Sequence, residues 1–376
     1  MITFSAVVTA CEKVEDYYEA VLDRTAFFPE GGGQYADTGV IDGIRVIDVQ
    51  EKNEIIYHKM EQPLEVGKTV EGSIEWEERF SKMQQHSGEH IVSGIVHAKY
   101  GYDNVGFHMG TDAITIDFNG PITKEELKEI EKKANEAVVQ NLDVQVTYPT
   151  REELVHLKYR SKIEIEGQVR LVTVPGHDAC ACCAPHVKKT GEIGLIKLIG
   201  MQNYKGGVRV SMLCGTRAIA DYEEKAQSVK RLSVLLSTPE QDVVEEVVRL
   251  KEQLSAQEVE LVKLQEKLLI CKAEQVEENQ EMVVLFESAL EGTAPRELVN
   301  FILERNTRVG AVFAGDGENY RYVIGSRTVD VRPVAKHLND RFQGRGGGKP
   351  EMVQGTISGS ERDIKEAMEV CKKEWC

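Results

Sequence analysis

Residues 83–101 read MQQHSGEHIVSGIVHAKYG, and the fold is best worked out from this stretch. Apolar residues at positions 91, 92, 95 and 96 recur with helical spacing, and Gly101 is a typical helix terminator. His86 and His90 are four residues apart, so a helix places both imidazoles on one face, where they can hold one metal ion. Such pairs also arise by chance on core or surface helices, and the pair alone fits either interpretation.

A second cluster, residues 180–186, reads CACCAPH. Cys182 and His186 form a C-x-x-x-H unit, and with the two helical histidines they make a donor set suited to one Zn²⁺ ion per chain. Cys180 and Cys183 are within reach as alternative thiols, or serve packing or redox chemistry. The two clusters could also be unrelated, with His186 capping a turn, but their joint occurrence favours a metal site.

Three consecutive glycines, Gly31, Gly32 and Gly33, precede Gln34. Glycine has no Cβ, so this backbone can approach a ligand or another chain segment closely. A tight turn of a β-barrel is the competing explanation. The glycines do not form a phosphate-binding loop, because no Lys-Ser/Thr pair follows them.

The predicted fold class is α+β, with four parts. Residues 1–79 read as short strands between turns, including a hairpin with Asp42-Gly43 at its tip, which is typical of a small β-barrel. Residues 80–217 alternate helices and strands, and a capping box at Thr123 marks one helix start. We expect this second part to be a mixed α+β domain that contains the zinc site.

Residues 218–281 look almost wholly helical. Apolar residues alternate by four and three from Val243 to Cys271, the pattern of a coiled-coil seam. The seam would support a homodimer, while an intramolecular helical hairpin explains it equally well. Residues 282–376 predict a C-terminal α/β domain with a glycine-rich loop at 343–350 that contacts RNA or another subunit.

The chain has 376 residues and a formal net charge of -16, which at first argues against a nucleic-acid partner. The acidic residues crowd the helical segment, however, whereas residues 205–217 and 341–349 are locally basic, so binding of a nucleic acid is compatible with the charge. No apolar run approaches the roughly 20 residues that span a bilayer. With no signal peptide in view, we expect a cytoplasmic protein without a membrane partner.

Three ordered motifs resemble the editing domain of alanyl-tRNA synthetase and its free-standing relatives, the AlaX-type alanyl-tRNA editing proteins. They are residues 22–34 (LDRTAFFPEGGGQ), His86 with His90, and Cys182 with His186 followed by residues 190–194 (TGEIG). The glycine-rich tail at residues 344–352 resembles the DHH-associated domain at the end of that synthetase. The resemblance covers nearly the whole chain, as in the long form of the editing family.

The resemblance implies a zinc-dependent hydrolase that deacylates alanine tRNA, tRNA(Ala), wrongly charged with serine or with glycine. The metal ligands that it implies are His86, His90, Cys182 and His186. Because the chain lacks the synthetase's aminoacylation domain, editing in trans is expected. The family's usual Cys-Gly-Gly-Thr-His reads CCAPH here, and Pro185 would stiffen that loop.

The resemblance also assigns pocket residues. Gln34 is implied as a catalytic residue, and Thr25 with the three loop glycines as substrate-binding residues. A threonine hydroxyl that bonds the serine side chain would spare alanine, which lacks that partner. An ordinary strand residue is the alternative for Thr25.

Two further sets of residues are candidates. Glu89 lies between the two histidines and is a candidate general base, although a solvated glutamate is the commoner outcome at such a position. Arg345 and Lys349 flank the tail glycines and are candidate contacts for RNA phosphates. A bound Zn²⁺ ion would activate water and polarise the carbonyl, or would only position the substrate.

Two alternative functions remain open at this point. A zinc hydrolase of a small ester or amide would use the same donor set, but it would not need the long C-terminal extension. A zinc-stabilised RNA-binding protein without catalysis would not need Gln34 or Thr25. The editing hydrolase accounts for all of these features.

Overall fold

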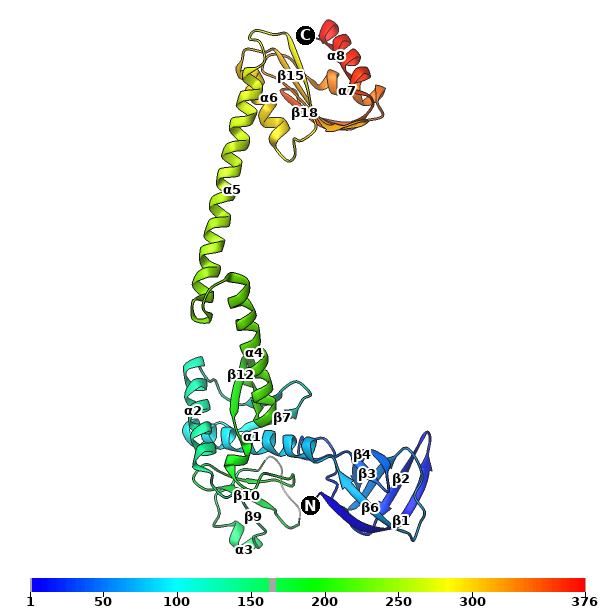
Figure 1. The fold of residues 1–376 in the computed structure, drawn as a ribbon, viewed down its shortest axis with the longest axis vertical. Helices are drawn as coiled ribbons and strands as arrows, with labels where there is room; N and C mark the ends of the chain where they lie inside the picture. Colours follow the sequence, from blue (N-terminus) through cyan, green and yellow to red (C-terminus); the bar gives the residue numbers. More distant parts are fainter. Residues whose placement is uncertain (1, 162–166, 376) are drawn as a thin grey trace. The chain divides into compact units, whose positions relative to one another are not determined.

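The computed structural model describes residues 2–161 and 167–375, and the chain divides into two compact units, residues 1–232 and 233–376 (Figure 1). The first unit contains the predicted β-barrel and the mixed α+β part. The second contains a long helix and the C-terminal sheet. Each unit is described by itself.

The N-terminal part of the first unit is a closed six-stranded barrel, as predicted. Its strands are β1 (Thr3–Val14), β2 (Tyr17–Leu22), β3 (Gly39–Ile41), β4 (Ile44–Lys52), β5 (Ile55–Met60) and β6 (Thr69–Ile74). They pair in the order β1-β2-β5-β4-β3-β6, and antiparallel pairing of β1 with β6 closes the barrel. Asp42 and Gly43 both have positive φ (47° and 78°), which a primed hairpin turn between β3 and β4 requires.

The barrel interior holds one buried histidine among apolar side chains. His58 is fully buried, and its Nδ1 lies 3.1 Å from the carbonyl oxygen of Ala20. A carbonyl only accepts, so Nδ1 carries the proton and Nε2 accepts from the Thr25 hydroxyl at 2.8 Å. Burial lowers the pKa of His58 to about 4, although the bond to Ala20 opposes this. The ring is therefore neutral in the folded protein at pH 7.

Helix α1 (Trp76–Tyr100) leaves the barrel and runs through the α+β part of the unit (Figure 1). It begins before the predicted change at residue 80 and ends at Gly101, whose φ is 71°. Every residue from 82 to 96 is buried, because α2, β11, β13 and other elements contact this helix on several sides. Buried polar side chains on such a helix need partners inside the protein.

Two sheets and a second helix surround α1. Helix α2 (Lys124–Gln140) begins with the predicted capping box, in which Thr123 and Glu126 bond reciprocally. The first sheet, in the order β12-β13-β8-β7, contains β7 (Asn104–Met109), β8 (Ile114–Phe118), β12 (Ile196–Tyr204) and β13 (Gly207–Cys214). The second, in the order β11-β10-β9, contains β9 (Gln145–Thr147), β10 (Leu171–Val174) and β11 (Asp178–Ala181). The short helices α3 (Arg151–Leu154) and η1 (Thr190–Ile193) complete this part.

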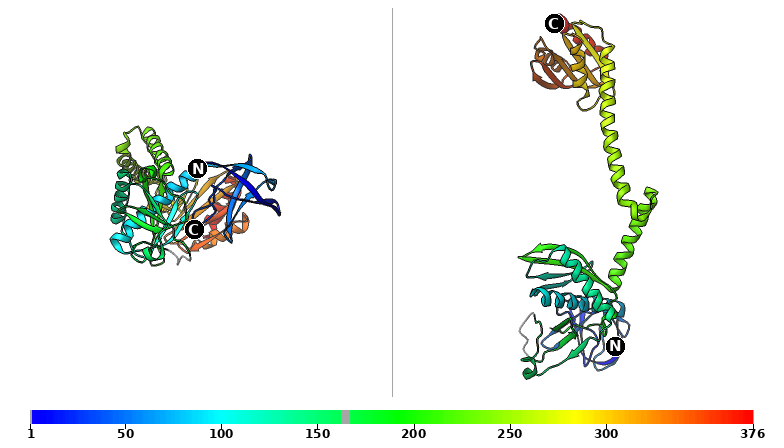
Figure 2. Two further views of the ribbon diagram at one scale, coloured as in Figure 1. Left: turned by 90° about the horizontal axis from the view of Figure 1, so that it is seen from below. Right: turned by 90° about the vertical axis from the view of Figure 1, so that its left-hand side faces the viewer.

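The predicted helical segment is interrupted. Helix α4 (Gly215–Leu236) ends before Pro239, and the short helix η2 (Glu240–Asp242) leads into α5 (Val243–Glu274), the long helix seen in Figure 2. Most positions of the predicted seam, including Leu250, Leu254 and Leu261, are exposed. A coiled coil therefore stays a prediction.

The second unit contains one five-stranded sheet in the order β14-β15-β16-β18-β17. Its elements after α5 are β14 (Met282–Glu287), α6 (Ala294–Glu304), β15 (Val309–Asp316), β16 (Asn319–Ser326), α7 (Arg332–Arg341), β17 (Arg345–Lys349), β18 (Met352–Ser358) and α8 (Glu361–Trp375). Two apolar clusters pack the sheet against its helices, one with α5 and α6 and the other with α7 and α8. This is the predicted α/β domain.

The prediction of a glycine-rich loop at 343–350 is wrong for most of its length, because residues 345–349 form the exposed edge strand β17. A Cβ on Gly346 would lie 2.6 Å from the Tyr322 hydroxyl, and one on Gly348 would lie 2.3 Å from the carbonyl oxygen of Met352. The glycines thus allow β17 to pair closely with β18. Separately, none of the helices in the described residues is long and apolar enough to cross a membrane.

The neutral His58 predicts a pH-dependent stability of the first unit. Between pH 6.5 and pH 4, His58 is protonated in the unfolded chain but stays neutral in the folded protein. The free energy of unfolding therefore falls as pH falls, by up to about 3 kcal/mol. We expect His58→Gln to reduce this fall in denaturant titrations at pH 7 and pH 4.5. The exposed His156→Gln variant is the control and should keep the parent's pH dependence; equal slopes for all three proteins would refute the assignment.

Candidate metal centre

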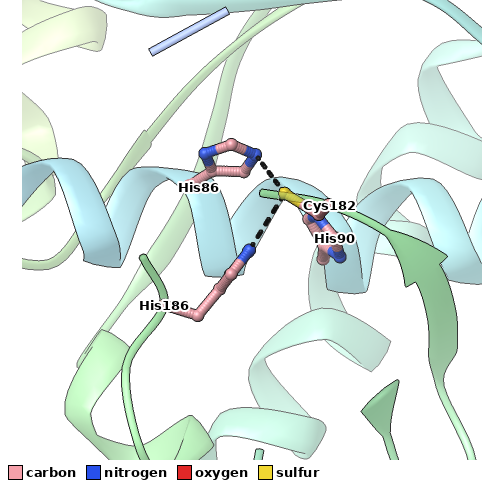
Figure 3. A group of neighbouring side chains, drawn as sticks. All are labelled: His86, His90, Cys182 and His186. Carbon is pink, nitrogen blue, oxygen red and sulfur yellow. Dashed lines mark hydrogen bonds between the residues drawn. The ribbon is translucent and has the colours of Figure 1, made fainter. Parts of the chain in front are cut away.

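Four donor side chains from separate parts of the first unit meet beside α1 (Figure 3). His86 and His90 lie one turn apart on α1, while Cys182 directly follows β11 and His186 lies in the loop after it. One donor atom from each residue lies within 4.8 Å of all the others. The structure thus brings together the four residues proposed as metal ligands.

The spacing of the donors fits a tetrahedral zinc ion. The Cys182 Sγ lies 3.6 Å from Nε2 of His86 and 3.4 Å from Nε2 of His186. Bonds of about 2.3 Å from zinc to sulfur and about 2.0–2.1 Å to nitrogen, at tetrahedral angles, give a sulfur–nitrogen separation of about 3.6 Å. The set of one thiolate and three imidazoles also suits Zn²⁺ chemically.

Each histidine is oriented through its other ring nitrogen. The Nδ1 of His86 donates to Oε1 of Gln34 at 3.1 Å, Nδ1 of His186 lies 3.1 Å from the Ser87 hydroxyl, and Nδ1 of His90 lies 3.1 Å from Oδ2 of Asp178. Engaging Nδ1 leaves Nε2 as the ligand atom. Sequence analysis missed Ser87 and Asp178: the first adjoins His86, while nothing local marks the second.

The protonation states of two of the donors, Cys182 and His186, favour binding of a metal cation, whereas that of His90 opposes it. Burial alone would raise the pKa of the Cys182 thiol, but hydrogen bonds from His186, His86 and His90 outweigh it and hold that pKa far below its usual range. Burial and the charge of His90 lower the pKa of His186 to about 3. Burial opposes protonation of His90, but its bonds to Asp178 and Cys182 raise its pKa well above the usual value. A metal ion would meet a thiolate and a neutral His186, and would displace a proton from His90.

Glu89 is buried, so the interpretation of a solvated glutamate is wrong. Its Oε1 accepts a hydrogen bond of 2.6 Å from the Ser93 hydroxyl and another from the Asn104 side-chain amide. Its Oε2 lies 3.9 Å from Nε2 of His90. The carboxylate therefore lies beside the metal ligands in a fixed orientation.

A cavity of about 600 Å³ opens over three of the four donors. Its lining includes His86, His90, Cys182, Glu89, Val105, Phe107, Arg160, Arg170, Cys183 and the glycines at 32 and 33. Arg170 also holds the ligand loop, because its Nη1 donates to the carbonyl oxygens of Cys182 (2.7 Å) and Ala184 (2.9 Å). No sequence pattern pointed to this arginine.

The glycine motif is both a tight turn and a close contact with the α+β part. Gly31 and Gln34 exchange two backbone hydrogen bonds outside the barrel strands. Gly33 has φ of 82°, and a Cβ there would lie 2.7 Å from the Phe107 ring. A Cβ on Gly32 would lie 3.6 Å from the Cys183 sulfur. The turn thereby carries Gln34 into the buried contact with His86.

Three predicted residues lie elsewhere. Thr25 is bonded to His58 in the barrel, and the described residues that line the cavity do not include it. Arg345 and Lys349 stand exposed at the two ends of β17, in the second unit. Their roles stay predictions.

Comparisons with known proteins agree with the motifs. Residues 2–78 match the family of class II (A) tRNA synthetases. Residues 169–232 match the second additional domain of threonyl and alanyl tRNA synthetases, and residues 279–374 match the DHHA1 domain. The alanyl-tRNA editing protein AlaX-L of Pyrococcus horikoshii is 28% identical over 96% of this chain and 93% of that protein. The chain is therefore similar to this long-form AlaX editing protein over nearly the whole length of both proteins.

Synthetases are also similar. The alanine–tRNA ligase of Pyrococcus furiosus is 32% identical over 96% of this chain, but this chain spans only 41% of the ligase's length. The C-Ala domain of the Aquifex aeolicus alanyl-tRNA synthetase aligns over 26% of this chain and 93% of that domain, at 21% identity and a TM-score of 0.22.

Because Gly33 packs closely against Phe107, we expect that adding a methyl group at position 33 destabilises the first unit. Gly43 shares the positive φ of Gly33 but has open space around it, so Gly43→Ala should cost about 1–2 kcal/mol for the left-handed backbone alone. Gly33→Ala should cost a further 1–3 kcal/mol or so, because the Phe107 ring and carbonyl must shift. Denaturant unfolding of both variants measures the difference, and equal losses would show that the packing contact is unimportant.

Proposed function

We propose that this chain is a trans-editing hydrolase that deacylates tRNA(Ala) mischarged with serine, and also with glycine. The observation that carries the proposal is the convergence of His86, His90, Cys182 and His186, three of which line a cavity that Gly32 and Gly33 also line. The similarity to AlaX-L over 93% of that protein supports the same activity here. The name of that relative describes an alanyl-tRNA editing protein.

The metal of this site is proposed to be one Zn²⁺ ion per chain, held by the four donors. Its positive charge would favour the oxyanion that develops when the ester carbonyl is attacked. Four protein ligands normally complete a tetrahedral zinc site. The proton transfers are therefore assigned to side chains of the protein.

Glu89 is proposed as the general base. Ester hydrolysis requires that water loses a proton as its oxygen bonds to the carbonyl carbon, and that the ribose oxygen gains one as it leaves. The buried carboxylate of Glu89 is held by Ser93 and Asn104 at the cavity wall, next to the metal ligands. It can accept the first proton and return it to the ribose oxygen.

Gln34 is proposed to bind the ester carbonyl. Its Oε1 is occupied by His86, while its Nε2 is buried and has no hydrogen-bond partner among the described residues. A buried donor without a partner is costly unless a ligand satisfies it. Gln34 does not itself line the cavity, but His86, which it contacts, does. An amide N–H that reached the ester would donate to the oxygen that becomes negative during hydrolysis.

The cavity suits the small, polar end of a charged tRNA. The backbones of Gly32 and Gly33 line the cavity close to Cys183 and Phe107, and Arg160 and Arg170 supply cationic side chains at the lining. The position of Thr25 against His58 does not by itself support its predicted contact with serine. The proposed preference for serine or glycine rests on the small space beside the glycine turn.

The second unit is proposed to dock tRNA and to support a homodimer. Arg345 and Lys349 place two cationic side chains along an exposed strand, where phosphates can be reached. The exposed apolar residues of α5 would be covered by the same helix of a second copy. The site of action is proposed to be the cytoplasm.

The activity is tested by deacylation of tRNA(Ala) charged separately with serine, glycine and alanine. We expect release of serine and glycine, with alanine spared, and a loss of roughly 100-fold or more in Cys182→Ala. Cys271→Ala, which removes an exposed thiol on α5, is the matched control and should retain activity. No release from any charged tRNA by folded, zinc-loaded protein would refute the proposal and favour a small-ester hydrolase or a non-catalytic RNA-binding protein.

Removal of the metal separates catalysis from structure. If zinc serves the reaction, dialysis against a chelator should abolish deacylation while far-ultraviolet circular dichroism stays unchanged, and added Zn²⁺ should restore activity. Unfolding on chelation would instead indicate a structural ion.

A further inference from the structure

A buried ion pair stands behind one of the four donors. The guanidinium of Arg160 reaches the Asp178 carboxylate with two nitrogens, Nε to Oδ1 at 2.8 Å and Nη2 to Oδ2 at 2.9 Å. Oδ2 of the same carboxylate lies 3.1 Å from Nδ1 of His90. The three side chains form a continuous series in which the arginine fixes the carboxylate and the carboxylate fixes the imidazole.

The backbone is built to hold this series together. Arg160 donates its N–H to Ala179 and accepts one from Ala181, so it is paired with β11 on both sides of Cys180. On α1, Gly94 lies one turn after His90, and a Cβ there would lie only 2.3 Å from the His177 carbonyl oxygen and 2.7 Å from the Asp178 Cβ. A glycine inside a helix costs about 1 kcal/mol relative to alanine. Here it allows β11 to approach until Asp178 reaches His90.

All three side chains of this series are buried, which restricts the orientations that they can adopt. The side chains of His90 and Asp178 are each 2% exposed and that of Arg160 is 12% exposed. A charged carboxylate so deeply buried needs a partner, and the bidentate fork of Arg160 supplies it with a fixed orientation. The carboxylate can then accept from Nδ1 and direct Nε2 of His90 toward Cys182.

We infer that Asp178 and Arg160 are positioning residues for His90, and that they set the metal affinity of the site before any substrate binds. The inference rests on the proposed function only in that the site holds zinc. Neither residue needs to touch the ester. Ser87 and Gln34 hold the other two imidazoles through single neutral contacts, so the charged pair is the strongest orienting contact in the set.

The chain offers a closely matched control. Asp117 and Arg209 form a second bidentate pair in the same unit, with Nε to Oδ1 at 2.6 Å and Nη2 to Oδ2 at 2.7 Å. Asp117 is 6% exposed and Asp178 is 8% exposed as whole residues. The control pair joins β8 to β13 and touches no metal ligand among the described residues. By side chain Asp117 is 9% exposed and Arg209 23%, so Asp117→Asn removes the same charge from a buried ion pair that is somewhat more open than that of Asp178.

The test measures the zinc dissociation constant of the full chain by competition with a chromophoric chelator. We expect Asp178→Asn to weaken zinc binding 10–100-fold or so, Arg160→Lys to weaken it in the same direction, and Asp117→Asn to leave it unchanged. The visible spectrum of the Co²⁺-loaded protein should also change in the first two variants only. Neither readout requires catalytic activity. If the protein binds zinc but does not deacylate tRNA, the proposed function is refuted, while the effect of Asp178 and Arg160 on zinc binding can still be measured.

Folding is checked by circular dichroism for every variant. If Asp178→Asn does not fold, Arg160→Lys decides the question, because it keeps the charge and loses only the fork. Zinc affinity equal to the parent in the folded variants would overturn the inference. An equal loss of affinity in Asp117→Asn would also overturn it, because the effect would then come from general destabilisation.

Discussion

The middle of α1 is buried on every side and yet is rich in polar side chains, and much of the first unit is arranged to satisfy them. Gln85 exchanges hydrogen bonds with the backbone of Cys214, Ser87 with the His186 region, and Glu89 with Ser93 and Asn104. Leaving any of these groups without a partner would cost more than a typical hydrogen bond gains. The neighbouring strands and loops are therefore fixed relative to the helix before a metal ligand is considered.

The candidate metal centre depends on the same hydrogen-bonding requirement. Nδ1 of His86 and Nδ1 of His186 are hydrogen-bonded inside the protein, Nδ1 of His90 lies 3.1 Å from the Asp178 carboxylate, and the remaining nitrogens converge on the Cys182 thiolate. The donors come from two segments distant in sequence, so their convergence depends on the packing of β11 and the following loop against α1. A thiolate among imidazoles is stable in this buried place because hydrogen bonds outweigh the cost of burying the charge.

Glycines determine how closely these segments approach. Gly33 brings the turn from the barrel onto Phe107, and Gly94 brings β11 onto the helix that carries the histidines. In the second unit, Gly346 and Gly348 let an edge strand lie flat against its neighbour. The absence of a side chain is what each contact requires, which is why a loop was the natural but incorrect prediction for residues 345–349.

The sequence by itself determined the barrel, most of the course of α1 and the α/β class of the C-terminal part, since hydrophobic periodicity and turn residues are local properties. The family resemblance added the choice of Cys182 among the neighbouring cysteines as the proposed fourth donor. Only the tertiary structure decided that Glu89 is buried, that Thr25 faces His58 and that the helical segment breaks before Pro239. It also revealed Asp178, Arg160 and Arg170 behind the donors. Those contacts join residues far apart in the chain, and no local pattern encodes them, because they depend on how separate elements pack.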